Sequence, residues 1–389
     1  MKRVSRVLLL LLVAVVVLAA CNRQEEEGQA AAAADTEPEY RIAIAFDVGG
    51  RGDRSFNDSA YNGLVLLAEE FDGYIDGDPD DVDFGSNIEL KYLEPRQGGQ
   101  DREQLLRVLA EDGYDLLYGV GFAYTDSLAK VAEEFPETHF VLIDGFVEGL
   151  DADSNITCIA FAEHEGSFLV GALAGWGLED MGGRLGFLGG MDIPLIHKFH
   201  GGFMAGAMYA NESLREDDGI LGQYIGQDPT AFSDPQTAEN IARNMYANDA
   251  EIVYHAAGNS GSGLFKAAND LDKWAIGVDS DQGLIYATSE NEQEQAIAEH
   301  ILTSMLKRVD QSVFLVAEDF INNGGSVDGG YRTFGLSDGG VGVAINDYNR
   351  ELISPYTDDL DDLRQMVIDG EITVPDHDEK IPEWTAETF

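Results

Sequence analysis

Basic side chains are scarce in this chain of 389 residues, which has 24 lysines and arginines against 72 acidic residues and a net charge of −48. A surface this negative repels phosphate backbones and anionic lipid heads, which excludes nucleic-acid binding by a basic face. Because salt screens the repulsion between like charges, the acidic excess is typical of a protein adapted to a saline habitat. We interpret the charge as a property of the whole surface and not as a binding site.

Cysteine is nearly absent, with Cys21 and Cys158 only. A basic start and the apolar run 7–20 precede Cys21, and this run is shorter than the about 20 residues that span a bilayer. The sequence Leu-Ala-Ala-Cys resembles the lipobox of bacterial lipoproteins, which predicts a signal peptide at 1–20 and a lipid anchor on Cys21. An ordinary signal peptide with an incidental cysteine is the alternative. An acylated Cys21 leaves Cys158 without a disulfide partner, as a small core residue.

Several catalytic motifs are missing. There is no GxxxxGK[ST], no GxGxxG after the first predicted strand, no HExxH and no GxSxG, which argues against binding of NTP or NAD and against zinc-protease or serine-hydrolase chemistry. His197 and His200 are the one close histidine pair, and no carboxylate near them in sequence offers a third ligand, so neither a metal nor a cofactor is predicted. Nucleoside hydrolases need a tight aspartate cluster after the first strand, whereas Asp47 and Asp53 are far apart in the loop. The sequence therefore predicts no enzyme.

Short apolar runs alternate with amphipathic segments from residue 41 to residue 279. Strands followed by helices at this cadence indicate βαβ units and parallel sheets. There are too many strands for one sheet with a single switch point, so we expect an α/β protein with two doubly wound lobes. The expected strands are 41–46, 88–94, 114–121, 139–145, 155–161, 183–190, 221–226, 250–258 and 273–279.

Nearly every expected strand is followed by glycines together with a carboxylate or an aromatic residue. Ligands of open parallel sheets bind at this carboxyl edge, and carboxylates accept hydrogen bonds from hydroxyl or amino groups. The combination suits a neutral ligand rich in donors and does not suit a phosphate. Phe56 and Asn57, after the first strand, could stack on a flat ring and read its edge. The alternative is that Phe56 is a hydrophobic staple and Asn57 the N-cap of a helix.

At these residues the chain resembles the basic membrane lipoprotein family, the purine-nucleoside-binding subunits of ABC transporters. Characteristic blocks are DVGGRGDRSFNDSAYNGL (47–64), GFLGGMDIPLIHKFHGGFMAG (186–206), VYHAAGNSGSGLFKAA (253–268) and WAIGVDSDQ (274–282). The resemblance implies the type I periplasmic-binding fold, in which three crossings hinge two α/β lobes. It also implies a monomeric, lipid-anchored binding protein at the outer face of the cytoplasmic membrane or in the periplasm. Its permease and ATPase would be separate chains.

The resemblance also implies roles for individual residues in binding the base. Phe56 would form one wall of a sandwich around the purine. Phe199 is the first choice for the opposite wall, and Phe232 is the second. The purine edge would be bound by Asn57 and Asp126, with Asp47 nearby.

The ribose hydroxyls would be held, by the same resemblance, by Gly258, Asp279 and Lys307. Asp281 could replace Asp279, since spacing does not separate the two. For Lys307 the alternative is an ordinary solvated lysine on a helix. For the function as a whole, the alternatives are a nucleoside-processing hydrolase and a binding protein for another small polar ligand such as a sugar.

The expected boundaries combine the strand pattern with the family fold. Residues 283–300 depart from the family pattern, which predicts a crossing that differs locally from that of the family. The expected segments are a tether at 21–39, lobe 1 at 40–160 plus 283–312, lobe 2 at 161–282 plus 313–345, and a C-terminal extension at 346–389 that covers a lobe.

Overall fold

The computed structural model describes residues 37–96, 98–215 and 219–389, and residues 39–389 form one compact unit. The predicted signal peptide, the predicted lipidation site Cys21 and the tether as far as residue 36 lie outside the described residues. A search of the described helices finds none that is long and apolar enough to cross a membrane.

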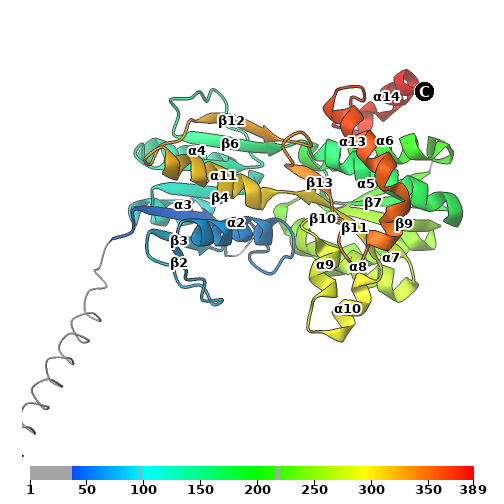
Figure 1. Cartoon of the computed structure of the whole chain (residues 1–389), viewed down its shortest axis with the longest axis horizontal. Coiled ribbons are helices and arrows are strands. Elements are labelled where there is room, and N and C mark those ends of the chain that lie inside the picture. The colour runs from blue at the N-terminus through cyan, green and yellow to red at the C-terminus, as the bar shows by residue number, and fades with distance from the viewer. Residues whose placement is uncertain (1–36, 97, 216–218) are drawn as a thin grey trace, which may run out of the picture. The chain divides into compact units, whose positions relative to one another are not determined.

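Two mainly parallel sheets form the two lobes of the compact unit (Figure 1). The strands are β1 (Tyr40–Ala45), β2 (Tyr74–Ile75), β3 (Ile88–Leu93), β4 (Leu116–Val120), β5 (His139–Ile143), β6 (Ile156–Phe161), β7 (Arg184–Met191), β8 (Ile220–Gly226), β9 (Ala250–Ala256), β10 (Trp274–Asp279), β11 (Ile301–Lys307), β12 (Gly330–Phe334) and β13 (Val341–Val343). Within the described residues the first sheet has the order β12-β6-β5-β4-β1-β3-β2 and the second the order β13-β11-β10-β9-β7-β8. Only β13 pairs in antiparallel fashion, with β11, among these strands.

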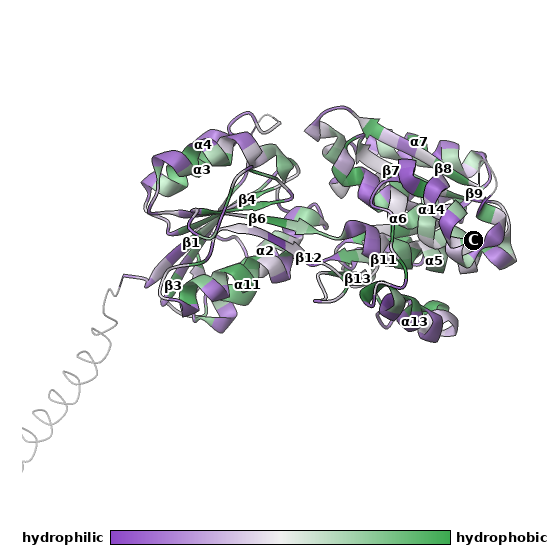
Figure 2. Ribbon diagram, turned by 90° about the horizontal axis from the view of Figure 1, so that it is seen from above, coloured by the Kyte–Doolittle hydropathy of each residue, from purple (hydrophilic) through white to green (hydrophobic). Residues whose placement is uncertain are grey.

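Helices cover both faces of each sheet, as a doubly wound fold requires (Figure 2). The α-helices are α2 (Phe56–Glu70), α3 (Arg102–Glu111), α4 (Thr125–Glu134), α5 (Glu163–Met181), α6 (Pro194–Ala210), α7 (Pro235–Ala247), α8 (Gly261–Leu271), α9 (Gln282–Ala287), α10 (Glu292–Ala298), α11 (Val309–Asn322), α12 (Arg350–Ile353), α13 (Thr357–Ile368) and α14 (Ile381–Thr388). On the first sheet, α2 and α11 lie on one face and α3 and α4 on the other, whereas α5 and α6 lie opposite α7 and α8 on the second. The predicted fold class is thus confirmed.

The strand β1 shows why the strands are recognisable in the sequence. Ile42 and Ile44 pack beneath α2 and α11, while Ala43 and Ala45 pack beneath α3 and α4, and all four are fully buried. A strand buried on both faces reads as a continuous apolar run and not as an alternating one. Each of the nine strands predicted between 41 and 279 is present, with its ends shifted by two residues or fewer.

One hydrophobic core runs through both lobes. It joins the side chains under α2 and α11, such as Leu64 and Val313, to those under α5 and α6, such as Phe168 and Phe203. Smaller separate cores lie under α3 and α4 and under α7 and α8. The apolar side chains of the hinge segments, such as Phe161 and Leu336, belong to this core and make it continuous between the lobes.

The chain crosses between the sheets three times in the described residues: after β6, after β11, and between β12 and β13. Backbone hydrogen bonds join the crossings, from Ala162 N to Phe334 O at 2.8 Å and from Arg308 N to Gly340 O at 2.8 Å. This is the three-crossing hinge that the family resemblance implied.

The predicted lobe boundaries after residue 282 need correction. Strand β11 (Ile301–Lys307) pairs with β10, so residues 283–307 belong to the second lobe and not to the first. Helix α11 packs on α2 and strand β12 pairs with β6, which places residues 309–334 in the first lobe. The apolar run at 301–306 is a buried strand, but periodicity over so short a run does not say which sheet receives it.

The C-terminal extension packs on the second lobe. Leu360, Leu363 and Val367 of α13 are buried in the shared core, and α14 contacts α6. The expectation that residues 346–389 cover a lobe agrees with this arrangement.

Helices α5 and α6 approach each other closely through glycines. A β-carbon on Gly206 would lie 1.9 Å from the carbonyl oxygen of Phe168, and one on Gly202 would lie 2.2 Å from that of His164. Only glycine permits this backbone contact. The contact fixes α6, whose first turns reach the space between the lobes.

Candidate functional site

A cavity lies between the lobes, with an empty volume of about 650 Å³ including the part open to solvent. It is lined by residues at or just beyond the carboxyl ends of β1, β4 and β5 in the first lobe and of β9, β10 and β11 in the second. Parallel strands bring their carboxyl ends to one edge of each sheet, and two such edges face each other here. The starts of α2 and α6 and the segment between β8 and α7, with Pro229 and Phe232, complete the lining.

Eight of the ten predicted ligand-binding residues line this cavity, and two do not. Asp126 is exposed in the first turn of α4. Asp281 caps α9 by accepting a hydrogen bond from Leu284 N and accepts two more from the Asn346 side chain. The lining residues are Asp47, Phe56, Asn57, Phe199, Phe232, Gly258, Asp279 and Lys307.

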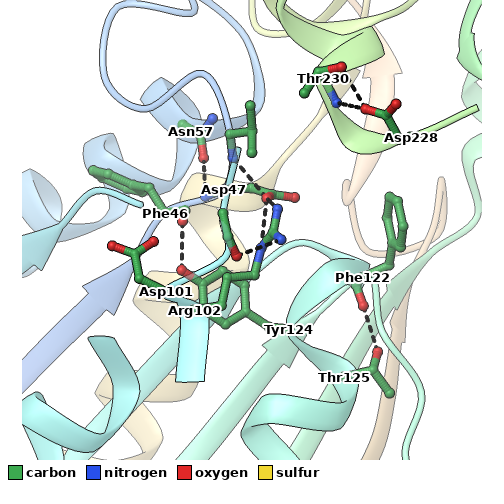
Figure 3. A network of polar contacts seen from close by, with 12 residues as sticks. Phe46, Asp47, Asn57, Asp101, Arg102, Phe122, Tyr124, Thr125, Asp228 and Thr230 are labelled. Atoms are coloured by element: carbon green, nitrogen blue, oxygen red, sulfur yellow. Dashed lines mark hydrogen bonds and ion pairs between the residues drawn. The ribbon is translucent and has the colours of Figure 1, made fainter. Parts of the chain in front are cut away.

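Asp47 is held at the end of β1 by an arginine (Figure 3). The Arg102 guanidinium donates to Asp47 Oδ1 through both Nε (3.2 Å) and a terminal nitrogen (2.5 Å), and Val48 N donates to the same oxygen. Burial raises the pKa of the Asp47 carboxyl, and Arg102 opposes that shift. The second oxygen, Oδ2, lies against Gly121, where a β-carbon would come within 2.4 Å of it. Gly121 thus leaves room for the carboxylate in the cavity wall.

Asn57 fastens the start of α2 to the end of β1. Its Oδ1 accepts from Asp47 N at 2.9 Å, and its Nδ2 donates to Asp53 Oδ2 at 3.0 Å. Asp53 also accepts from the backbone N–H groups of Ser55, Asn57 and Asp58, so Asp53 and not Asn57 caps this helix. The amide of Asn57 keeps one donor and one acceptor position for a ligand.

Lys307 is buried at the end of β11, with 2% of its surface exposed, and is not on a solvated helix. Its Nζ donates to Asp144 Oδ2 at 2.5 Å and lies 3.1 Å from Glu163 Oε1. Burial raises the pKa of Asp144 to about 6 against the opposing effect of Lys307, and the negative charges around Lys307 raise the pKa of the ammonium despite its burial. Asp144 Oδ1 is buried and has no hydrogen-bond partner among the described residues.

Asp279 joins the lobes beside the cavity. Ser55 Oγ of the first lobe donates to Asp279 Oδ2 at 2.5 Å, and Ser280 Oγ donates back to the Ser55 carbonyl at 3.1 Å. Next to them the Gln282 amide donates to the carbonyl of Arg54 at 3.1 Å. The loop after β1 and the segment after β10 are therefore tied together.

Phenylalanine rings line the cavity from both lobes: Phe56 and Phe122 from the first, and Phe199 and Phe232 from the second. The Phe122 and Phe232 rings meet edge to face with centroids 6.5 Å apart, and Figure 3 shows Phe122 pointing toward the second-lobe loop that precedes Phe232. Lys307 Nζ lies 5.2 Å from the Phe56 ring centroid and 5.6 Å from that of Phe199. The cavity thus combines aromatic faces with carboxylates and one ammonium group.

Three lining residues are absent from the predicted set although the sequence carries a signal for them. Phe122 and Asp144 directly follow strands, as Asp47 does, and the strand-end argument applies to them equally. Asp53 lies three residues before Phe56 and is fully used in capping α2.

His255 precedes Ala256, which lines the cavity, and is fully buried. Its Nε2 is 3.0 Å from Gln282 Oε1, which also accepts from Val278 N, so the imidazole is the donor. Burial lowers the pKa of His255 to about 4. The neutral imidazole is the form that the fold accommodates.

We predict that acid destabilises the protein through His255. In the unfolded chain its pKa is about 6.5, so between pH 6.5 and 4 the unfolded state binds more protons, and the free energy of unfolding falls as the pH is lowered. For a shift of this size the loss is about 3 kcal/mol. Urea unfolding of wild type and His255→Gln at pH 7 and pH 4 measures it. We expect the wild type to lose more stability than the variant, and equal losses would contradict the prediction.

Several known proteins are similar to this chain in sequence or in structure. The family model for Bmp, described as "ABC transporter substrate-binding protein PnrA-like", matches residues 41–378. The chain is 30% identical over 350 residues to the ABC transporter nucleoside-binding protein BmpA of Lactococcus lactis, covering 87% of this chain and 89% of that protein. It is 34% identical over 304 residues to an uncharacterised lipoprotein of Pyrococcus furiosus, covering 78% and 69%.

A solved structure is similar over nearly the whole compact unit. The crystal structure of an ABC transporter solute-binding protein from Aeropyrum pernix superposes with a TM-score of 0.71 and 26% sequence identity. The match covers 89% of this chain and 98% of that one. The likeness therefore includes both lobes and the hinge.

Proposed function

The chain belongs to the Bmp family of PnrA-like ABC transporter substrate-binding proteins, and on this premise we propose that its interlobe cavity captures a purine nucleoside for import. The family resemblance inferred from the sequence is confirmed, and with it the class of extracytoplasmic binding proteins that perform no catalysis. The observation that carries the proposal is that aromatic rings and buried polar groups from both lobes line one cavity.

The base would stack between aromatic rings. Phe56 forms one wall, and Phe199 is the preferred opposite wall because both rings flank Lys307 Nζ. Phe232 packs against Phe122 and would close the cavity from the side. Asn57 and Asp47 lie where the free positions of an amide and a carboxylate can read the polar edge of a purine. A wrong base would leave these buried groups unpaired, which costs affinity.

The ribose would be bound by acceptors at the ends of β5 and β10. Asp144 Oδ1 is buried and lacks a partner in the described part of the chain, so a sugar hydroxyl could donate to it. Asp279 accepts from Ser55, and its carboxylate has room for a further donor. Gly258 has φ +54° and lets the backbone approach the ligand without a side chain.

The proposed function also includes anchoring of the protein to a membrane and delivery of the nucleoside to a permease. Lipidation of Cys21 would hold the protein at the outer face of the cytoplasmic membrane or in the periplasm, and the acidic, Ala-rich segment up to residue 39 would let it move. The lipoprotein of Pyrococcus furiosus supports this location by its name. A monomer would deliver the nucleoside to a permease energised by an ATPase, each a separate chain. Nucleoside binding would shift an existing equilibrium between open and closed lobes.

Titration calorimetry tests the proposal. The protein is unfolded and refolded to remove carried-over ligand, then titrated in high salt with guanosine, inosine, adenosine, cytidine and ribose. We expect sub-micromolar binding of at least one purine nucleoside and no heat with ribose. Binding of ribose without binding of any nucleoside would show that the ligand is a sugar and not a nucleoside. No heat with any nucleoside, from protein shown by circular dichroism to be folded, would contradict the proposal.

A further inference from the structure

A second polar cluster lies where α6 meets the C-terminal extension. It is on the side of α6 that faces away from the glycine contacts with α5. His197 and His200 are one turn apart on α6, and the extension brings Asp378 to them. His197 Nδ1 is 2.7 Å from Asp378 Oδ1, and His200 Nδ1 is 3.4 Å from Asp378 Oδ2. One potential ligand atom from each residue lies within 4.8 Å of the others. The fold thus brings a carboxylate from a distant segment to both histidines, which their spacing in the sequence does not reveal.

The orientation of His197 is fixed by another carboxylate. Its Nε2 lies 2.8 Å from Asp192 Oδ1, so Nε2–H donates to Asp192 and the lone pair of the neutral ring is on Nδ1. That lone pair faces Asp378. Histidines that bind metals commonly donate their other ring N–H to a carboxylate in this way, which orients the ring and makes it a better ligand.

The cluster contains more acceptors than donors. Tyr224 Oη lies 3.0 Å from His197 Nδ1 and 3.1 Å from His200 Nδ1, so its proton can serve His197, and the tautomer of His200 decides whether Nδ1 donates or presents its lone pair. Asp378 Oδ1 is buried and accepts no hydrogen bond from the described residues, although it lies close to His197. Buried acceptors that face one another need a cation or extra protons between them.

A further histidine adds to the excess of lone pairs. His377 Nδ1 accepts from Glu379 N at 3.1 Å, which places its lone pair rather than its proton on this nitrogen. The same nitrogen is 3.0 Å from Asp378 Oδ1, and the His377 ring stacks on His197 with centroids 4.2 Å apart. Asp378 is thus surrounded by imidazole nitrogens.

We propose that His197, His200 and Asp378 bind a divalent transition metal ion. Two imidazole nitrogens and one carboxylate oxygen are ligands that Zn²⁺ prefers, whereas Ca²⁺ and Mg²⁺ prefer oxygen ligands alone. Tyr224 Oη or water would complete the coordination. The ion would pin the C-terminal extension to the helix that carries Ile196 and Phe199 in the cavity wall.

The test uses purified full-length protein freed of metal with a chelator and then titrated with ZnCl₂. Excess Mg²⁺ in the buffer occupies the many surface carboxylates, so the calorimeter reports the site with nitrogen ligands. We expect one Zn²⁺ per chain and a higher melting temperature with Zn²⁺ present. Visible absorption of bound Co²⁺ provides a second readout of nitrogen ligation.

Matched variants decide between the metal site and an ordinary ion-pair cluster. His197→Ala and Asp378→Asn should lose Zn²⁺ affinity by more than a hundredfold, and Asp192→Asn by about tenfold to hundredfold. His300→Ala, whose Nδ1 contacts the carbonyl of Lys273 outside the cluster, should bind Zn²⁺ like the wild type. Because the Asp192 side chain is 52% exposed, its replacement leaves the packing intact. Absence of stoichiometric Zn²⁺ binding, or equal binding by all variants, would overturn the proposal and leave protonated histidines as the partners of Asp378.

Discussion

Replacing Lys307 by methionine is expected to lower the free energy of unfolding by about 3–5 kcal/mol, because it leaves buried carboxylates without their partner. Lys307 is 2% exposed and contacts Asp144 and Glu163, and its charge also acts on Asp279. Methionine preserves most of the volume, so the loss reports the charge and not a cavity. Urea unfolding of the ligand-free protein in high salt measures the effect.

A second replacement separates electrostatics from packing. Combining Lys307→Met with Asp144→Asn removes one uncompensated charge, while Glu163 keeps Lys198 Nζ at 3.0 Å, so we expect the double variant to regain much of the lost stability. Lys130→Met is the surface control: Lys130 is 59% exposed and pairs with Glu103, and such a pair contributes about 1 kcal/mol or less. If Lys307→Met were no more harmful than Lys130→Met, the buried cluster would not depend on its cation.

Replacing Phe56 by alanine is expected to weaken nucleoside binding by about tenfold to hundredfold, because stacking on an aromatic ring contributes about 1–3 kcal/mol per base. Phe56 is the first residue of α2 and lines the cavity, so its ring can contact a ligand, and its partly buried side chain also packs against the shared core. Titration calorimetry with the purine nucleoside that binds best to the wild type measures the change.

Phe146→Ala is the matched control for Phe56. The Phe146 side chain is 61% exposed and stacks on Tyr331 outside the cavity, so its loss should leave affinity unchanged. Phe199→Ala and Phe232→Ala in the same series tell which ring of the second lobe is the opposite wall. Unchanged affinity in Phe56→Ala, with the fold intact, would show that the ligand is not stacked on this ring.

The sequence predicts most of the sheets because the relevant forces are local. A run such as RIAIAF is short, apolar on both faces and followed by glycines, which favours a buried strand, and the residue after such a strand lies at the carboxyl edge of its sheet. This is why Asp47, Asp279 and Gly258 could each be placed at the carboxyl edge of a sheet, whereas their meeting in one site was implied only by the family resemblance.

Features that depend on which distant segments pair could not be predicted in this way. The Lys307 strand joins the second sheet and α11 returns to the first, and nothing within either segment encodes that choice. Asp144 becomes a partner of Lys307, and Asp378 a neighbour of His197, only after the chain has folded. Contacts of this kind need the whole fold, or a resemblance to a known one, to be seen.

The three crossings also set the order in which the chain can complete its lobes. The first sheet lacks its edge strand β12, and helix α2 lacks its neighbour α11, until residues 309–334 have been made. By then β7 to β11 of the second lobe have already been synthesised. The first lobe thus begins early and is completed only after most of the second lobe has been made, and the second lobe in turn waits for β13 and the C-terminal extension. The apolar α2 face of the first lobe stays uncovered through most of synthesis, which makes it the part most in need of a chaperone or of delayed folding.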